Sequence, residues 1–77
     1  MTELTFPQMS PERPDATGVL ATWYAADGEA VGEGQLVGEV QMDKVDAEVF
    51  APVAGTITLL VAEGDEVAQG APIARIA

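Results

Sequence analysis

One side chain in this sequence stands out as able to do chemistry, the amine of Lys44. It is the only lysine among 77 residues, thirteen of which are acidic. A lysine amine is a cation at neutral pH, and it becomes a nucleophile only where burial or a nearby cation favours the neutral form. Asp43 and Asp46 lie close by in the sequence and favour the charged form instead. We therefore expect Lys44 to be a site of covalent attachment, which an external ligase deprotonates and acylates, and not a catalyst.

Other routes to catalysis or metal binding are scarce. The chain has no histidine and no cysteine, which removes the usual general base, the commonest metal ligand, the Ser-His and Cys-His nucleophile pairs and every disulfide. The carboxylates of Glu39, Asp43, Asp46 and Glu48 could attract calcium, but their alternation along two strands lacks the spacing of a calcium-binding loop. The sequence thus predicts a solvated acidic face, with no catalytic residue and no metal site.

The formal net charge of −10 restricts the class of partner. Nucleic acids and anionic lipid surfaces are bound by basic side chains, so neither is expected here, whereas a partner with a basic patch would be steered toward this chain. No apolar run is long enough to span a bilayer, and the N-terminal residues lack the basic start and apolar centre of a signal peptide. We expect a cytoplasmic protein, or a mitochondrial matrix protein in a eukaryote.

The residues around Lys44 alternate as the two arms of a hairpin. Residues 36–42 and 45–50 are expected strands, with Asp43-Lys44 at the bend between them. Apolar side chains can point inward while the polar side chains between them point to water. The expected inward residues are Val40, Met42 and Val49, and the expected outward residues are Gln41, Asp46 and Glu48. A half-buried hairpin of this kind would hold Lys44 out from the rest of the chain.

The remainder of the chain has the pattern of short strands separated by turns. Expected strands cover residues 3–6, 18–24, 30–31, 55–61 and 72–76, with a further short strand at Val67. A loop that contains Pro7, Pro11 and Pro14 lies between the first two strands. Trp23 is expected at a core or half-buried strand position. Since no segment has sustained helical periodicity, the fold class is all-β, a sandwich or flattened barrel of two antiparallel sheets.

The sequence also repeats itself. The pattern of glycines and aliphatic residues in 28–40 recurs in 64–76, with Gly28 and Gly34 matching Gly64 and Gly70 at expected turns. Two similar halves imply pseudo-twofold symmetry, in which each half completes the sheets of the other. In such an arrangement the Lys44 bend and the C-terminus at Ala77 would lie at opposite ends of the sandwich.

Taken together, these residues resemble the lipoyl domain, the carrier domain of 2-oxo acid dehydrogenase acyltransferase components. The resemblance covers residues 6–76. Its motifs are Glu39-Val-Gln-Met-Asp43-Lys44-Val45, Gly28-Glu29-x-Val31-x-x-Gly34 before it, and Ala51-Pro52-x-x-Gly55 and Glu63-Gly64-Asp65-x-Val67-x-x-Gly70 after it. The Asp43-Lys44 pair is the specific element, because glycines and valines alone would also fit the wider biotinyl/lipoyl group.

This resemblance implies a fold, a cofactor and a position for the proline-rich loop. The fold would be the flattened β-barrel of the biotinyl/lipoyl hammerhead type, with residues 1–77 forming one lipoyl-like carrier domain. Lys44 would carry lipoic acid, covalently attached as a lipoyl amide, with Asp43 and Val45 as flanking recognition residues. The proline-rich loop would lie beside the lysine hairpin.

A function and a set of partners are implied in the same way. The chain would be a swinging-arm carrier and not an enzyme, passing acyl groups and reducing equivalents between the active sites of a 2-oxo acid dehydrogenase complex. Its expected partners are a lipoate ligase or lipoyl transferase, together with the decarboxylase, acyltransferase and dihydrolipoyl dehydrogenase components of the complex.

Two alternatives stay open. Biotin carrier domains of carboxylases place methionines immediately on both sides of the modified lysine, whereas here Asp43 and Val45 are the neighbours and Met42 lies one position further away. Gln41 and Met42 also depart from the Glu-Thr-Asp-Lys-Ala pattern usual in lipoyl domains, which bears on recognition by the ligase. The second alternative is an unmodified domain of the same fold that serves structure or protein contacts, as in efflux adaptors.

Overall fold

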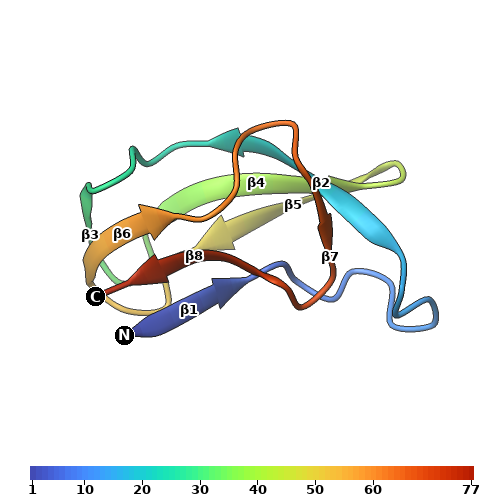
Figure 1. Ribbon diagram of the computed structural model, residues 1–77, viewed down its shortest axis with the longest axis horizontal. Coiled ribbons are helices and arrows are strands. Elements are labelled where there is room, and N and C mark those ends of the chain that lie inside the picture. The colour runs from blue at the N-terminus through green and yellow to red at the C-terminus, as the bar shows by residue number, and fades with distance from the viewer.

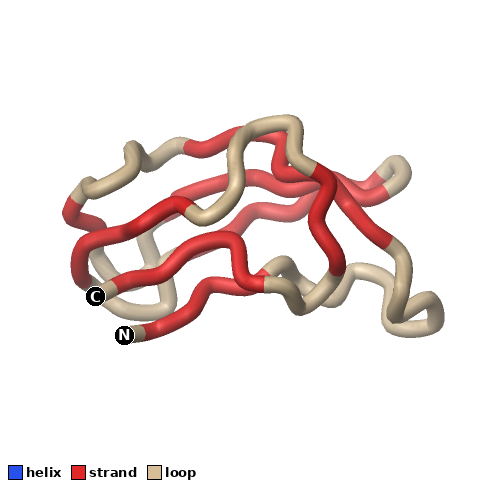
Figure 2. Tube along the Cα trace, viewed as in Figure 1, coloured by secondary structure: helices blue, strands red, loops and turns tan.

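The computed structural model describes residues 1–77 as eight strands joined by turns and loops (Figure 1), with no helix anywhere in the chain (Figure 2). The strands are β1 (Thr2–Thr5), β2 (Thr17–Trp23), β3 (Ala30–Val31), β4 (Leu36–Met42), β5 (Val45–Phe50), β6 (Gly55–Leu59), β7 (Glu66–Ala68) and β8 (Pro72–Ile76). The structure accordingly has no helix that could cross a membrane. The expected all-β class is confirmed, and the bounds expected for β3, β4, β5 and β8 are those observed.

Both sheets are antiparallel, and each is assembled from both halves of the chain. The strand order is β1-β8-β6-β3 in one sheet and β5-β4-β2-β7 in the other. Replacing each strand by the one four places away along the chain, β1 by β5 and β8 by β4, converts the first order into the second. The pseudo-twofold symmetry expected from the sequence repeat is therefore present in the topology.

Hydrogen bonds at the turns follow the same symmetry. The backbone N–H of Gly28 donates to the carbonyl oxygen of Ile57 at 2.7 Å, and that of Gly64 donates to the carbonyl oxygen of Leu20 at 2.7 Å. These two glycines have φ values of 85° and 89°, in the left-handed region that glycine adopts without steric cost. Each half thus closes a turn against a strand of the other half, β6 in one case and β2 in the other.

The core between the sheets is built largely from matched aliphatic side chains. Its largest fully buried members are three pairs related by the repeat, Leu20 with Ile57, Val37 with Ile73 and Val40 with Ile76, together with Phe6. Phe6 has no large partner of this kind, because the symmetry-related position in the other half of the chain is occupied by Ala51. Phe6 accepts a backbone hydrogen bond from Gly70 just as Ala51 accepts one from Gly34. The core is therefore symmetric except where the aromatic ring of Phe6 fills one end.

Trp23 lies half-buried at the end of β2, as expected for a strand position. Its indole Nε1–H donates to the carbonyl oxygen of Val61 at 2.9 Å, and its backbone N–H donates to the carboxylate of Glu63 at 2.9 Å. The related bond in the other half runs from the backbone N–H of Leu59 to the carboxylate of Asp27, also at 2.9 Å. Carboxylates next to the two glycine turns therefore tie the halves together.

The molecule is elongated, with extents of 33 × 19 × 18 Å along its principal axes. The loop that joins β4 to β5 lies at one end of the long axis, at the right of Figure 1, and both chain termini lie at the other end. The expected separation of the Lys44 bend from the C-terminus is confirmed.

Candidate functional site

Lys44 lies at the tip of a β-hairpin. The loop between β4 and β5 consists of Asp43 and Lys44 alone, and Met42 and Val45 form the last strand pair before it. Asp43 has a φ of 55°, in the left-handed region where aspartate is better tolerated than most residues. The Lys44 side chain is exposed. The lysine side chain is therefore accessible at the end of the hairpin.

The arms of the hairpin are anchored in the core by one face. Val40, Met42 and Val49 are buried, as expected from the alternation of the sequence. The polar residues between them, Gln41, Asp46 and Glu48, are exposed, again as expected. The tip therefore stands on two strands whose inner side chains are packed between the sheets.

The two residues expected to flank the site differ in their surroundings. Val45 is 58% exposed, which leaves an apolar side chain on the surface next to the lysine. Asp43 is not free, because Nη2 of Arg13 donates a hydrogen bond to its Oδ2 and forms an ion pair with it. The hydrogen bond and the charge of Asp43 raise the pKa of the Arg13 guanidinium above its ordinary value. The carboxylate next to Lys44 is thus engaged by an arginine and not by the lysine itself.

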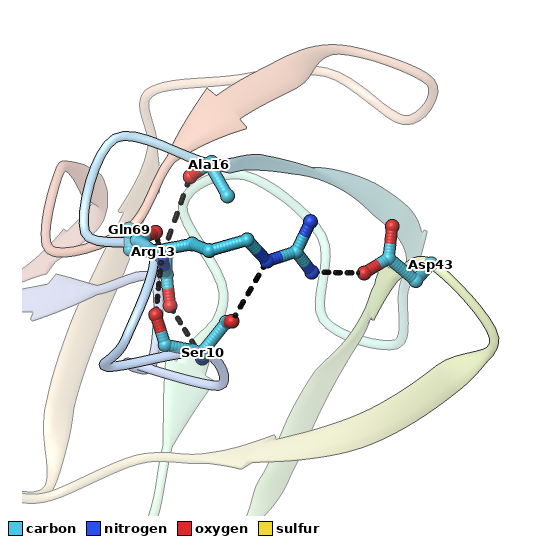
Figure 3. Close-up of polar contacts among 5 residues, drawn as sticks. All are labelled: Ser10, Arg13, Ala16, Asp43 and Gln69. Atoms are coloured by element: carbon cyan, nitrogen blue, oxygen red, sulfur yellow. Dashed lines mark hydrogen bonds and ion pairs between the residues drawn. The ribbon is translucent and has the colours of Figure 1, made fainter.

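Arg13 belongs to the connection between β1 and β2, residues 6–16, hereafter the β1–β2 loop. Gln69 holds this loop in place (Figure 3). The Nε2 amide of Gln69 donates to the carbonyl oxygens of Arg13 at 2.9 Å, Ser10 at 3.3 Å and Ala16 at 3.4 Å. In return, Oε1 of Gln69 accepts a bond from the backbone N–H of Ser10 at 2.7 Å. The loop is therefore an ordered structure wrapped around one amide, and it lies beside the lysine hairpin as the resemblance implied.

Neither Arg13 nor Gln69 was singled out by the sequence. Arg13 is one of three basic residues in the chain, which is the only signal it gives. The contact between Arg13 and Asp43 spans 30 positions of sequence, and the bonds of Gln69 to the loop span 53 to 59. Contacts of this range depend on how the two sheets place the loop, and no local pattern encodes them.

The carboxylates on the outer face of the hairpin form a solvated acidic surface. Glu39 and Glu48 are directly opposite each other on β4 and β5, and Asp46 is opposite Gln41. No group of three or more side chains that could hold a metal ion occurs in the structure. The two ion pairs in the structure are between Arg13 and Asp43 and between Arg75 and Glu3. Of the four carboxylates of the expected acidic face, Asp43 is therefore paired with an arginine, whereas Glu39, Asp46 and Glu48 form no ion pair.

An exposed lysine at the tip of a hairpin, on a pseudo-symmetric β-sandwich, is an arrangement suited to a carrier module. The family described as "Biotin-requiring enzyme" matches residues 2–76. The chain therefore belongs to the biotin/lipoyl attachment family.

Relatives of this chain are components of 2-oxo acid dehydrogenase complexes. Over 60 residues it is 47% identical to the dihydrolipoyllysine-residue acetyltransferase component of the pyruvate dehydrogenase complex of Corynebacterium glutamicum, covering 77% of this chain and 9% of that protein. Over 75 residues it is 36% identical to the dihydrolipoyllysine-residue succinyltransferase component of the 2-oxoglutarate dehydrogenase complex of Cupriavidus necator, covering 96% of this chain and 18% of that protein. The chain thus spans less than a fifth of the length of these relatives.

A solved structure shares the whole fold. The lipoyl domain of the 2-oxoglutarate dehydrogenase complex from Azotobacter vinelandii matches with a TM-score of 0.79 and 31% sequence identity, covering 100% of this chain and 96% of that chain. The resemblance to lipoyl domains inferred from the motifs is therefore confirmed, as is the fold of two four-stranded antiparallel sheets.

Proposed function

We propose that residues 1–77 form one carrier domain that bears lipoic acid on Lys44 as a lipoyl amide. The observation that carries this proposal is the exposure of Lys44 in the two-residue loop of the β4–β5 hairpin. A ligase must enclose the acceptor amine, and later partners must admit the whole arm. A narrow tip with its arms fixed in the core meets both requirements without unfolding.

The side chains around the tip fit an acceptor role. The carboxylate of Asp43 is bound by Arg13, and neither ion pair of the structure involves the Lys44 amine. A ligase therefore has no ion pair to break before it deprotonates this lysine. When attached, the lipoyl group supplies a dithiolane that carries acyl groups and reducing equivalents. The chain has no cysteine, so it has no thiol that could exchange with the disulfide of a dithiolane at the tip.

Lipoate is preferred to biotin because of the immediate neighbours of the lysine. Biotin carriers place methionines on both sides, whereas this hairpin has Asp43 and Val45 there. Met42, the one methionine nearby, is 4% exposed and points into the core. It therefore does not offer its thioether beside the amine in the way a flanking methionine would.

The domain would serve a 2-oxo acid dehydrogenase complex as a carrier and not as an enzyme in itself. This part of the proposal is supported by the relatives, which are acyltransferase components of such complexes. The partners would be a lipoate ligase or lipoyl transferase, and the decarboxylase, acyltransferase and dihydrolipoyl dehydrogenase components. The expected compartment is the cytoplasm, or the mitochondrial matrix in a eukaryote. The net charge of −10 would favour partners whose docking surfaces are basic.

Intact mass spectrometry tests the proposal. The protein is incubated separately with lipoate ligase, lipoate and ATP, and with biotin ligase, biotin and ATP. The variant Lys44→Arg keeps the charge at the tip but offers no amine, and Lys44→Ala removes both. We expect one lipoyl group per chain of the natural sequence, and none on either variant.

Any other result would assign a different function or a different attachment site. One biotinyl group on Lys44 and no lipoyl group would assign the domain to a carboxylase. No gain of mass from either ligase, on a protein shown by its far-ultraviolet circular dichroism to be folded, would favour the unmodified contact domain. Modification that persists in Lys44→Arg would place the attachment elsewhere.

A further inference from the structure

The two halves of the fold differ most at the end that carries Lys44. The β1–β2 loop has residues 6–16, whereas the symmetry-related connection between β5 and β6 has only residues 51–54. Gln69, which anchors the long loop, is related by the repeat to Glu33, which makes no such contacts. The short connection closes its half of the fold without a long loop. The β1–β2 loop is therefore longer than closing this half of the fold requires.

The loop presents Arg13 in a fixed position. The Arg13 N–H donates to the carbonyl oxygen of Ser10 at 3.0 Å, and its own carbonyl oxygen accepts from Ala16 at 2.9 Å and from Gln69 at 2.9 Å. The guanidinium Nε also donates to the hydroxyl of Ser10 at 3.4 Å. Ser10 is itself buried, at 7% exposure. An arginine held at both its backbone and its guanidinium loses less conformational entropy when it binds a partner than a free one does.

The partner of this arginine is the residue before Lys44. Figure 3 shows the Arg13 side chain extended from the loop toward Asp43 on the hairpin. Both side chains are largely exposed, at 56% and 62%, and exposed ion pairs contribute little to the stability of a fold. What this pair does instead is join the tip of the hairpin to a second, independently anchored segment. It ties down a turn whose backbone is in the left-handed region at Asp43.

We propose that Arg13 is a positioning residue for Lys44, and that its ion pair with Asp43 holds the Asp43-Lys44 turn in the form that the modifying ligase binds. The inference rests on the proposed role of Lys44 as the attachment site. Without Arg13 the turn would sample other conformations, so a smaller fraction of the protein would have the conformation that the ligase binds. The apparent affinity of the ligase would fall in proportion to that fraction. The acylation step itself would be unchanged, because Arg13 does not contact the reacting amine.

Steady-state kinetics of lipoylation give the first test. We expect Arg13→Gln to raise the KM of lipoate ligase for the domain by about two- to fivefold, with kcat unchanged. Arg13→Lys keeps the charge but not the planar fork, so it should restore part of the loss. The matched control is Arg75→Gln, which removes the same charge from the other exposed ion pair, with Glu3 on β1. That control should leave KM unchanged.

A double-mutant cycle separates positioning from direct recognition. Asp43→Asn removes the charge but keeps a side chain that tolerates the left-handed backbone. If Arg13 acts through Asp43, then Arg13→Gln raises KM by a smaller factor in the Asp43→Asn background than in the natural sequence, because asparagine keeps at most a neutral hydrogen bond to Arg13. If the ligase contacts each residue separately, the two effects multiply, and the positioning role is overturned.

Backbone relaxation of the unmodified domain provides a readout that does not depend on the ligase. The heteronuclear NOE of the Asp43, Lys44 and Val45 amides reports motion on the picosecond to nanosecond scale. We expect these values to fall in Arg13→Gln and to stay unchanged in Arg75→Gln. Equal values in the two variants would overturn the inference.

The possible failures are distinguishable. If the natural sequence takes up no lipoyl group, the proposed function fails, and the role of Arg13 toward the ligase fails with it. If the natural sequence is modified and Arg13→Gln matches Arg75→Gln in KM, only the role of Arg13 is overturned. Urea unfolding of every variant confirms that a change in KM is not a loss of folded protein.

Discussion

The aromatic ring of Phe6 fills the space in which a side chain at Gly18 would have to lie. A Cβ atom at Gly18 would stand 2.3 Å from Cζ of Phe6 and 2.7 Å from the carbonyl oxygen of Gln41. Gln41 lies on β4, in the arm that leads to Lys44, and Gly18 is on β2, which pairs with it. The one aromatic residue of the fully buried core therefore lies against Gly18, at a place on β2 that adjoins the Gln41 backbone near the tip of the lysine hairpin. This packing is possible because position 18 has no side chain.

Gly18→Ala should destabilise the fold for this reason. The ring could rotate, but the carbonyl oxygen of Gln41 belongs to the β-ladder and cannot withdraw without disturbing it. Overpacking of this kind costs about 1–3 kcal/mol. Gly32→Ala is the control, because nothing lies within 4 Å of its Cβ position and its φ is not in the left-handed region. Urea unfolding should give a lower midpoint for Gly18→Ala and an unchanged or slightly higher one for Gly32→Ala. Equal midpoints would show that the core relaxes around the added methyl group.

The sequence alone was sufficient to predict the strands, the repeat and the exposed lysine. Each of these is encoded locally, by alternation along β4 and β5, by turn glycines and by a two-residue bend. Clearly alternating strands such as β4 and β5 were predicted with their observed bounds. β6 was predicted to run to Val61, but it ends at Leu59. The indole of Trp23 binds the carbonyl oxygen of Val61 there, a contact between side chain and backbone that no periodicity reveals.

The surroundings of the lysine could not be predicted from the sequence. The proline-rich stretch was recognised as a loop, and the family resemblance placed it beside the hairpin. Nothing in the pattern indicated that Gln69 anchors this loop or that Arg13 reaches Asp43. Such contacts form between side chains whose positions are fixed only after both sheets have assembled. The exposed lysine of the hairpin was thus predictable, and the contacts made by its neighbours were not.

Trp23→Phe should lower stability by at least the contribution of one lost hydrogen bond, because the smaller ring also loses packing against Gly38. The change keeps an aromatic ring at a half-buried position but removes the Nε1–H that donates to Val61. A typical intramolecular hydrogen bond contributes about 0.5–1.5 kcal/mol. Tyr24→Phe is the control, since the neighbouring side chain is 55% exposed. Thermal unfolding should show a lower midpoint for Trp23→Phe alone. A comparable loss in Tyr24→Phe would mean that the hydrogen bond is not the cause.

Glu48→Gln should stabilise the hairpin. Glu48 lies directly opposite Glu39 on the neighbouring strand, and like charges in that position repel each other. Removing one of them should contribute about 0.2–1 kcal/mol. Glu33→Gln removes the same charge from an exposed turn, so it measures the general relief of net negative charge. Thermal unfolding at low salt should give Glu48→Gln the larger gain, and 1 M NaCl should shrink the difference by screening. A gain that is equal in both variants would contradict the pairwise repulsion.

Gln69→Met should release the β1–β2 loop while leaving the sheets intact. Methionine has nearly the shape of glutamine, but it offers neither the acceptor for the Ser10 N–H nor the donor for the loop carbonyls. The Ser10 amide should then exchange its hydrogen about two- to tenfold faster, as expected for the loss of one hydrogen bond. Gln35→Met, which removes the bond from Gly32 to a glutamine in another turn, serves as the control and should leave Ser10 unchanged. Because Arg13 is carried by this loop, Gln69→Met should also raise the KM of lipoylation in the same direction as Arg13→Gln. Faster exchange at Ser10 with an unchanged KM would mean that the loop can loosen without releasing Arg13 from Asp43.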